Sequence, residues 1–494
     1  MTGNAIVLAM NRRKFIHAAG ATGLSLTSRF GFGATDPAVA LLNLLEDSPR
    51  ELIPRELVRL IRGGLRYGDL LSALALAAVR NVQPYPDVGY KYHSVMVLRP
   101  IHLTTQHLSS SDKWLPIAWA TDYFKATQAQ ERHTDGWRMP TRAVAPVGSA
   151  QAARQALIVG LDNWDRDAAD AAILNYAQVA RPEEIFSLLF PYGARDLRAI
   201  GHKAITVSNA HCLSELLGSA QAGPLLRSTV AALQNRDRDP NPANHDLQSD
   251  QPWRHNLQRL REIPRNWKQG RNDPGARAEL HAALYRVSED ESGTVIIALL
   301  RQGISPEAIW QVLFDTAAEL LIHQPGIVPL HAQTTANALY YAYRVCADER
   351  TQQLTLLQCA AFIAMFRKLV NTTQPAISLE ALQPLALDST ADAIDEIFAE
   401  VSAGRCLYAA RKSLSYLQTG GDAEALIAKA RHHLVYYADE PHDYKFSEAV
   451  FDSYAQLSNS DWRYRFLAAG MAYFKPPAKR PGPVVEQMLE RLKT

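Results

Sequence analysis

Residues 305–332 read SPEAIWQVLFDTAAELLIHQPGIVPLHA. Ser305 is a typical N-cap, and a proline at the first turn with Glu307 behind it completes the start signal of a helix. Apolar residues then recur every three or four positions as far as Leu321, which predicts an amphipathic helix. A short loop follows, and His331 stands at the expected start of a second helix. This stretch therefore predicts one helix pair with a histidine where its second helix begins.

The same helical spacing dominates the rest of the chain, whereas alternating β-branched runs between turn residues are almost absent. The nearest candidate for a strand is Thr294–Ile297, which is too short to indicate a sheet. We therefore predict an all-α fold. Further helices are expected at residues 38–45, 56–62, 65–79, 183–189, 351–370, 391–401 and 422–435.

The same pattern occurs three more times in the chain. Each copy consists of an amphipathic helix, a loop and a second helix with a histidine at its start. The first helices of the four copies are expected at 65–80, 183–197, 306–321 and 422–433, and the histidines are His93, His202, His331 and His442. Because each unit of such an array packs only on its neighbours, equivalent positions face the same side. We predict a helical-repeat or toroid-like array of antiparallel helix pairs, with the four histidines on one concave face.

A polar stretch interrupts this pattern. Residues 235–277 are crowded with Arg, Asp, Asn and Pro, and we predict a linker or surface excursion there. It separates an N-terminal helical half at 35–234 from a C-terminal helical half at 278–494.

Residues 1–34 are expected to be an export signal. Arg12 and Arg13 are followed by Phe15, Ile16 and a short, weakly apolar run, which is typical of a twin-arginine signal peptide. We therefore predict a periplasmic or exported protein, with the twin-arginine export machinery as a partner through this arginine pair. A basic helix start inside the mature protein is the alternative.

The composition excludes several classes of function. The chain has 52 Lys and Arg against 50 Asp and Glu, and this net charge of +2 gives no field that would attract nucleic acid. No segment after the signal reaches about 18 uninterrupted apolar residues, so we expect no mature membrane span. The four cysteines lack metal-like spacing, which favours free thiols. The glycine-rich dinucleotide, P-loop and serine-hydrolase motifs are also absent.

The last copy of the unit resembles a known family. Residues 440–449 read EPHDYKFSEA, and YRFLAA follows at 464–469. This order of His-x-x-Lys, a hydrophobic residue and Ser-Glu-Ala resembles the C-terminal region of questin oxidase-like proteins. The resemblance implies an all-helical fold and an oxidative activity, since the named members are fungal enzymes that open an aromatic polyketide ring by a Baeyer–Villiger-type oxidation with NADPH. A periplasmic enzyme has no obvious supply of NADPH, so neither that cofactor nor that substrate is carried over.

The histidines are the main chemical set. A helix dipole favours neutral imidazole at a helix start, which suits a base or a metal ligand. Several neutral imidazoles in one pocket would suit Fe, Cu or Zn. We assign no metal ligand from the sequence, because it contains neither an HExxH motif nor two histidines at four-residue spacing. Local bonding of each histidine to a loop carbonyl is the alternative. The candidate catalytic residues are His93, His202, His331, His442 and Lys445, with Lys445 as the partner of an anion.

Neighbouring residues are weaker candidates. His102 and His211 follow their partners by nine residues, which places them on the opposite helix faces. Lys203 is a further candidate anion partner, with a solvated lysine as the alternative. An aromatic pocket or ordinary core packing is expected for Tyr90, Tyr92, Tyr444, Trp114 and Trp119.

We therefore expect an exported, questin oxidase-like oxidoreductase that acts on an aromatic or quinone-like small molecule in a histidine-lined helical pocket. The sequence names no cofactor. The alternative is a non-catalytic helical-repeat binding or scaffold protein of the periplasm. Histidine side chains within about 5 Å of one another around an enclosed cavity would favour the enzyme, and outward-facing histidines on an open groove would favour the scaffold.

Overall fold

The structure is a computed structural model, and its all-α class confirms the prediction. No strand occurs among the residues that it describes, and their single β-bridge joins Arg271 to Ile304. Thr294–Ile297, the candidate strand, lies inside a helix. The residues of the expected export signal lie outside the described part of the chain. That part comprises residues 37–84, 91–134, 136–144, 148–218, 221–236, 239–375, 377–389, 391–457, 461–477 and 480–493.

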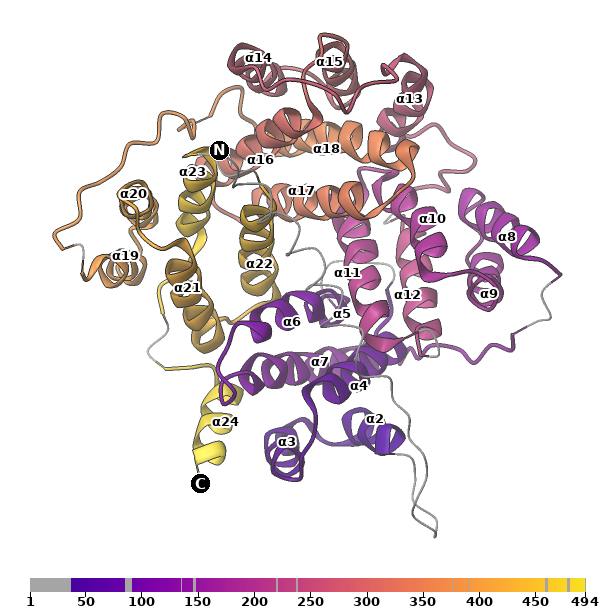
Figure 1. Ribbon diagram of the computed structural model, residues 1–494. Helices are drawn as coiled ribbons and strands as arrows, with labels where there is room; N and C mark the ends of the chain where they lie inside the picture. Colours follow the sequence, from indigo (N-terminus) through magenta and orange to yellow (C-terminus); the bar gives the residue numbers. More distant parts are fainter. Residues whose placement is uncertain are drawn as a thin grey trace, which may run out of the picture. The chain divides into compact units, whose positions relative to one another are not determined.

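The chain divides into two compact units, Met1–Leu41 and Leu42–Thr494, and everything below concerns the second. Four of its helices contact one another in a closed circuit: α6 packs against α11, α11 against α17, α17 against α22, and α22 against α6. Figure 1 shows these four helices around the centre of the view, with the short helix α5 beside α6. We call these four helices and α5 the ring helices. Their bounds are α5 (His93–Met96), α6 (Leu98–Gln106), α11 (His202–Leu217), α17 (Ile327–Val345) and α22 (Pro441–Gln456).

Each histidine-bearing helix packs against the helix that precedes its loop, as the sequence units predict. The contacts are α4 with α5, α10 with α11, α16 with α17, and α21 with α22. Ser305 accepts a hydrogen bond from the backbone N–H of Ala308, which confirms it as the N-cap of α16. The toroid-like arrangement of these pairs stays a prediction. The bounds are α4 (Tyr67–Asn81), α10 (Pro182–Ala194), α16 (Pro306–His323) and α21 (Ala423–Tyr437).

Several further helices contact the pairs directly. Among them α7 packs on α4 and α6, α12 on α11, and α18 on α15 and α17. The bounds of these and other helices are α2 (Pro37–Asp47), η1 (Arg50–Leu52), α3 (Ile53–Arg62), α7 (Trp114–Thr134), α8 (Ala150–Asp162), α9 (Arg166–Ala177), η2 (Arg198–Gly201), α12 (Gly223–Leu233), α14 (Pro274–Leu284), α15 (Glu289–Arg301), α18 (Glu349–Leu369), α19 (Ala393–Ser402), α20 (Cys406–Gln418), α23 (Asp461–Gly470), η5 (Met471–Tyr473) and α24 (Pro483–Lys493).

Residues 235–277 are not without structure. They contain η3 (Gln248–Asp250), α13 (Gln251–Arg259) and η4 (Leu260–Glu262), and α13 packs on α15 and α18. None of the described helices is long and apolar enough to cross a membrane. The four cysteines are free, as the sequence predicts.

Candidate functional site

The structure brings the four predicted histidines together. His93, His202, His331 and His442 are all buried, and each offers a ring nitrogen that lies within 4.8 Å of the other three. Their rings form a closed set of edge-to-face neighbours. The centroid distances around this set are 5.1 Å from His93 to His202, 4.5 Å to His331, 5.1 Å to His442 and 4.6 Å back to His93. We call these four residues the histidine tetrad.

The helices α5, α11, α17 and α22 each carry one tetrad histidine near the N-terminal end. His93 and His202 are the first residues of α5 and α11, and His442 is the second residue of α22. His331 lies one turn inside α17, because that helix starts earlier, at Ile327, than the sequence pattern predicts. The closed contacts of the ring helices point all four starts at one place. Helical spacing alone could not predict this, since it does not say which helices are neighbours.

The approach to His202 is a backbone turn that only a glycine completes. Ala199 and Ile200 adopt positive φ angles of 51° and 43°, and Gly201 follows at 83°. A side chain at Gly201 would collide with the Thr335 side chain on α17. Two non-glycine residues in the left-handed region cost roughly 1–2 kcal/mol each, so the surrounding structure must hold the turn in place. The turn presents the carbonyl of Ala199 to the ring of His202.

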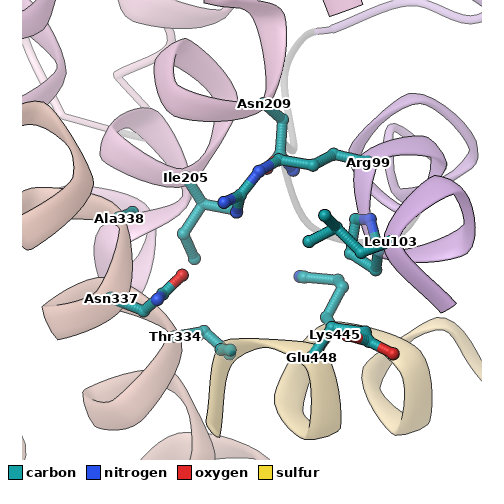
Figure 2. Close-up of a pocket in the computed structure, with 11 residues that line it drawn as sticks. Arg99, Leu103, Ile205, Asn209, Thr334, Asn337, Ala338, Lys445 and Glu448 are labelled. Carbon is teal, nitrogen blue, oxygen red and sulfur yellow. The ribbon is translucent and has the colours of Figure 1, made fainter. Parts of the chain in front are cut away.

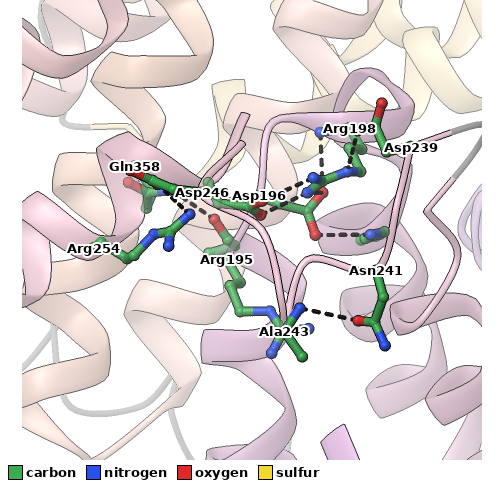
Figure 3. Close-up of polar contacts among 12 residues, drawn as sticks. Arg195, Asp196, Arg198, Asp239, Asn241, Ala243, Asp246, Arg254 and Gln358 are labelled. Atoms are coloured by element: carbon green, nitrogen blue, oxygen red, sulfur yellow. Dashed lines mark hydrogen bonds and ion pairs between the residues drawn. The ribbon is translucent and has the colours of Figure 1, made fainter. Parts of the chain in front are cut away.

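A buried ion network holds this turn (Figure 3). The guanidinium of Arg198 forms two hydrogen bonds to Asp250, at 2.6 and 2.8 Å, and one to Asp239 at 2.7 Å. Asp196 accepts from the Arg198 backbone N–H at 3.0 Å and from Lys203 Nζ at 2.7 Å. Burial acts to raise the pKa of Asp196, but Lys203 and Arg198 outweigh it and hold that pKa below its ordinary value. Residues 235–277 therefore contribute a buried anchor through Asp250.

In three tetrad rings the Nδ1 atom, which we call the outer nitrogen, lies within hydrogen-bond distance of an oxygen acceptor. Nδ1 of His202 lies 2.7 Å from the Ala199 carbonyl, and Nδ1 of His331 lies 2.6 Å from the Ile327 carbonyl. Nδ1 of His442 lies 3.2 Å from Glu440 Oε2. A carbonyl or carboxylate oxygen only accepts, so each of these Nδ1 atoms carries a proton. In the neutral rings the lone pairs are therefore on Nε2.

Those Nε2 lone pairs face inward. Nε2 of His202 lies 3.0 Å from Nε2 of His331 and 3.3 Å from Nε2 of His93. Nε2 of His442 is buried and has no hydrogen-bond partner. The lone pairs of His202 and His331 at this distance repel each other unless a proton or a cation lies between them. The tetrad is therefore arranged to receive a positive charge at its centre.

A proton on one of the tetrad imidazoles is disfavoured as the source of this positive charge. Burial is the main cause that lowers the pKa of His93, His202 and His331 well below the ordinary value, and neighbouring cationic groups, with Lys445 among them, lower it further. Burial also lowers the pKa of His442, although Glu440 works against it. The sequence predicts neutral imidazoles because of helix dipoles, whereas desolvation is the main cause of the lowered pKa values in the structure. At neutral pH the tetrad consists of neutral imidazoles.

A metal ion fits this arrangement. Nitrogen ligands 2.0–2.1 Å from a metal lie roughly 3–4 Å from one another in tetrahedral or square geometry, and the separations in the tetrad agree. Metal-binding histidines commonly donate the other ring N–H to a carbonyl or carboxylate, as His202, His331 and His442 do. The sequence contains no local metal-binding motif for this site, because its ligands lie more than a hundred positions apart.

A comparison with protein-family models, with curated proteins and with solved structures found no match for this chain. Family and function therefore rest on the residues themselves.

A small cavity of about 20 Å³ lies inside the ring helices (Figure 2). Lys445 is 3% exposed and reaches into it, and its Nζ has no hydrogen-bond partner among the residues that the structure describes. Burial lowers the pKa of this amine to about 7. Lys445 lies close enough to the tetrad for its charge to lower the pKa of all four histidines. The lining of the cavity also includes Arg99, Asn209, Thr334, Asn337 and Glu448.

Three residues that line the cavity are not among the candidates predicted from the sequence: Arg99, Asn337 and Glu448. Each stands six residues after a tetrad histidine and lines the cavity. Within a helix, six residues add about one and two-thirds turns, so this offset places a side chain deeper in the ring but about 120° away from the histidine's face. Arg99 lies on α6, the helix after the one that carries His93. Polar residues at a shared offset from the histidines were the signal that could have revealed them.

Other candidates lie elsewhere. Lys203 is paired with Asp196, so it is not a free anion partner. His102 and His211 are not among the tetrad. Tyr90 lies outside the described residues. Tyr92, Tyr444, Trp114 and Trp119 are buried, and none of them lines the cavity.

Proposed function

We propose that this chain is an oxidoreductase whose reaction centre is a single transition-metal ion held by the histidine tetrad. The observation that carries the proposal is the set of buried Nε2 atoms that face one another while acceptors hold the outer nitrogens of His202, His331 and His442. A scaffold protein has no need of four desolvated imidazoles around one point, and their burial costs it stability. The centroid distances of 4.5–5.1 Å between neighbouring rings support the enzyme by the spacing that we expect for it, while the cavity inside the ring helices is lined by other residues.

Iron and copper are the metals that the proposal requires. The ligand set is all imidazole and contains no thiolate, which suits zinc, copper, iron and nickel alike. Bound iron or copper would supply electron transfer and dioxygen chemistry that no side chain of the tetrad provides.

The side chains around the tetrad have distinct roles in this proposal. The carbonyls of Ala199 and Ile327 orient two rings, and the Glu440 carboxylate orients His442. Lys445 holds an anionic group or exchanges a proton at Nζ, because a pKa of about 7 leaves both protonation states populated at neutral pH. Burial of all four rings excludes bulk water from the reaction centre.

The substrate class rests on the resemblance of residues 440–449 to questin oxidase-like proteins. We propose an aromatic or quinone-like small molecule on that ground. The cavity of about 20 Å³ has room for a water-sized group and not for an aromatic ring. In this proposal the cavity holds a small reaction partner beside the metal, and the ring of the substrate binds outside it.

Metal analysis tests the reaction centre. We expect about one iron or copper ion per chain in protein purified from its native host, and at least a tenfold lower content in His331→Gln. The matched control is His102→Gln on α6, where a histidine next to Gln106 lies outside the tetrad. Equal metal content in wild type and His331→Gln contradicts the proposal. So does a wild-type chain that binds neither iron, copper nor zinc on reconstitution.

Activity separates the enzyme from the scaffold. Metal-loaded protein should consume dioxygen in the presence of hydroxylated anthraquinones, and His442→Gln should reduce the rate at least a hundredfold. Metal bound at full occupancy without turnover of any quinone would move the assignment to the scaffold alternative.

We further propose export by the twin-arginine route, which rests on Arg12 and Arg13. The double substitution of both residues by lysine should retain the protein in the cytoplasmic fraction. Unchanged export of this variant contradicts the proposal.

A further inference from the structure

The amine of Lys445 at the cavity inside the ring helices is not paired with a carboxylate of the cavity lining. Arg99 pairs with Asp452 at 3.0 Å, and Glu448 forms two hydrogen bonds of 2.9 Å each with Arg431. Both pairs are therefore neutral overall. Lys445 has no such partner, and its amine is buried at the cavity.

The nearby carboxylates are already occupied. Glu448 accepts from Thr104 at 2.7 Å in addition to Arg431, and Asp452 accepts from Asn337 at 3.0 Å in addition to Arg99. Among the described residues, neither forms a hydrogen bond with Lys445. The charge of Glu440 also acts on Lys445, but this carboxylate is paired with Lys475 at 2.7 Å. An unpaired ammonium in such surroundings loses its hydration without compensation, which costs several kcal/mol.

The donors around the cavity match an anion. Besides Lys445 Nζ, the Nε atom of Arg99 is buried without a hydrogen-bond partner, and Arg99 lines the same cavity. Figure 2 shows Arg99 and Lys445 reaching toward the same space from α6 and α22. Two unsatisfied cationic donors that face one enclosed space form a built site for a negative charge.

The volume limits what this ligand is. The cavity measures about 20 Å³, which is enough for one water-sized particle. Chloride and bromide are monatomic and need far less space than the tetrahedral sulfate and phosphate ions. The remaining lining includes Ile205, Leu103 and Ala338, so weakly hydrated anions are favoured over strongly hydrated ones.

We propose that this cavity binds one small monovalent inorganic anion of the halide class between Lys445 and Arg99. The site goes beyond the proposed function, because its donors are side chains of α6 and α22 and it needs no metal ion at the tetrad. A halide here compensates the buried ammonium and competes with the small reaction partner of the proposed function, because the cavity has room for only one such particle.

Bromide tests the site directly. Crystals of chelator-treated wild-type protein in sodium bromide should show one anomalous peak within hydrogen-bond distance of Lys445 Nζ. Metal-free protein is used so that a bromide bound to a metal cannot produce the signal. Density for water alone, or an anomalous peak only on the protein surface, overturns the proposal whatever the fate of the metal centre.

Variants test the assignment in solution. Bromide should raise the melting temperature of wild type in a saturable manner, while sodium sulfate at equal ionic strength should not. Lys445→Met should weaken bromide binding at least tenfold. The matched control is Lys125→Met, since Lys125 is a buried lysine whose amine donates to two carbonyls and to Gln128. The control should keep the wild-type affinity within twofold. Equal weakening in both variants, or none in Lys445→Met, refutes the site.

Discussion

Replacement of Lys445 by methionine should stabilise the metal-free protein. Most substitutions of buried residues destabilise a fold. Lys445 is different, because its amine is buried without a hydrogen-bond partner and without a paired carboxylate. Methionine keeps a long unbranched side chain in the same space and removes the charge. The increase in the free energy of unfolding measures how strongly the buried amine destabilises the wild-type fold.

The magnitude follows from the pKa of the amine. Burial lowers that pKa from 10.5 to about 7. At 1.36 kcal/mol per pH unit, this difference corresponds to about 5 kcal/mol of destabilisation while the amine is protonated. Between pH 7 and 10.5 the unfolded chain binds more protons than the native one, so the stability of wild type rises with pH in this window. The penalty is about 4 kcal/mol at pH 7 and about 2 kcal/mol at pH 9.

Urea unfolding of chelator-treated protein in a halide-free buffer measures the effect. Lys445→Met should exceed wild type by about 4 kcal/mol at pH 7, and the difference should shrink to about half at pH 9. Lys203→Met provides the contrast, because Lys203 is equally buried but paired with Asp196. Its removal leaves a buried carboxylate without its partner and should cost about 3–5 kcal/mol.

One result would refute this reasoning. If Lys445→Met is less stable than wild type, or if the difference does not change between pH 7 and pH 9, then the amine is compensated within the metal-free fold. In that case its pKa lies near the ordinary value of a lysine.

Three further substitutions test how the site is held, each by urea unfolding. Gly201→Ala should cost about 2–4 kcal/mol, because alanine disfavours a φ of 83° and its Cβ meets the Thr335 side chain; wild-type stability would contradict the turn. Arg198→Leu should cost about 3–5 kcal/mol, since it leaves the buried Asp250 unpaired, and the variant should lose metal affinity at the tetrad; unchanged metal affinity would show that the network does not position His202. Gly160→Ala on α8 should cost about 1–3 kcal/mol, because its Cβ would lie 2.7 Å from a backbone nitrogen of α9, and a neutral effect would mean that the two helices separate freely.

Helix positions were predictable because helix formation is local. The start of α16 follows from Ser305 and the proline behind it, whose interactions reach no further than the first turn. The start of α17 was predicted too late, since Ile327 is exposed and the apolar pattern begins only with the buried residues after it. The helical period predicts that His211 lies on another face of α11 than His202, and His211 is not among the tetrad. The same inference does not apply to His102, because it lies on α6 whereas His93 lies on α5.

The environment of each candidate side chain was not predictable in this way. Lys203 and Lys445 look alike in the sequence, each just after a tetrad histidine, yet one is paired with Asp196 and the other has no partner. Asp196 is seven residues from Lys203, but only the left-handed turn at Ala199 to Gly201 brings its carboxylate to that amine. A pattern of residue types does not contain such a turn.

The sequence by itself determined the all-α class, the helix pairs and the four histidines near helix starts, because each depends on residues a few positions apart. Only the tertiary structure decided that the histidines meet. His93 and His202 are separated by 109 positions, and His202 and His331 by 129. Their convergence requires the closed contacts of α6, α11, α17 and α22, which arise from packing between distant segments. The same packing desolvates Lys445 and the tetrad, and desolvation is the physical cause of their altered pKa values.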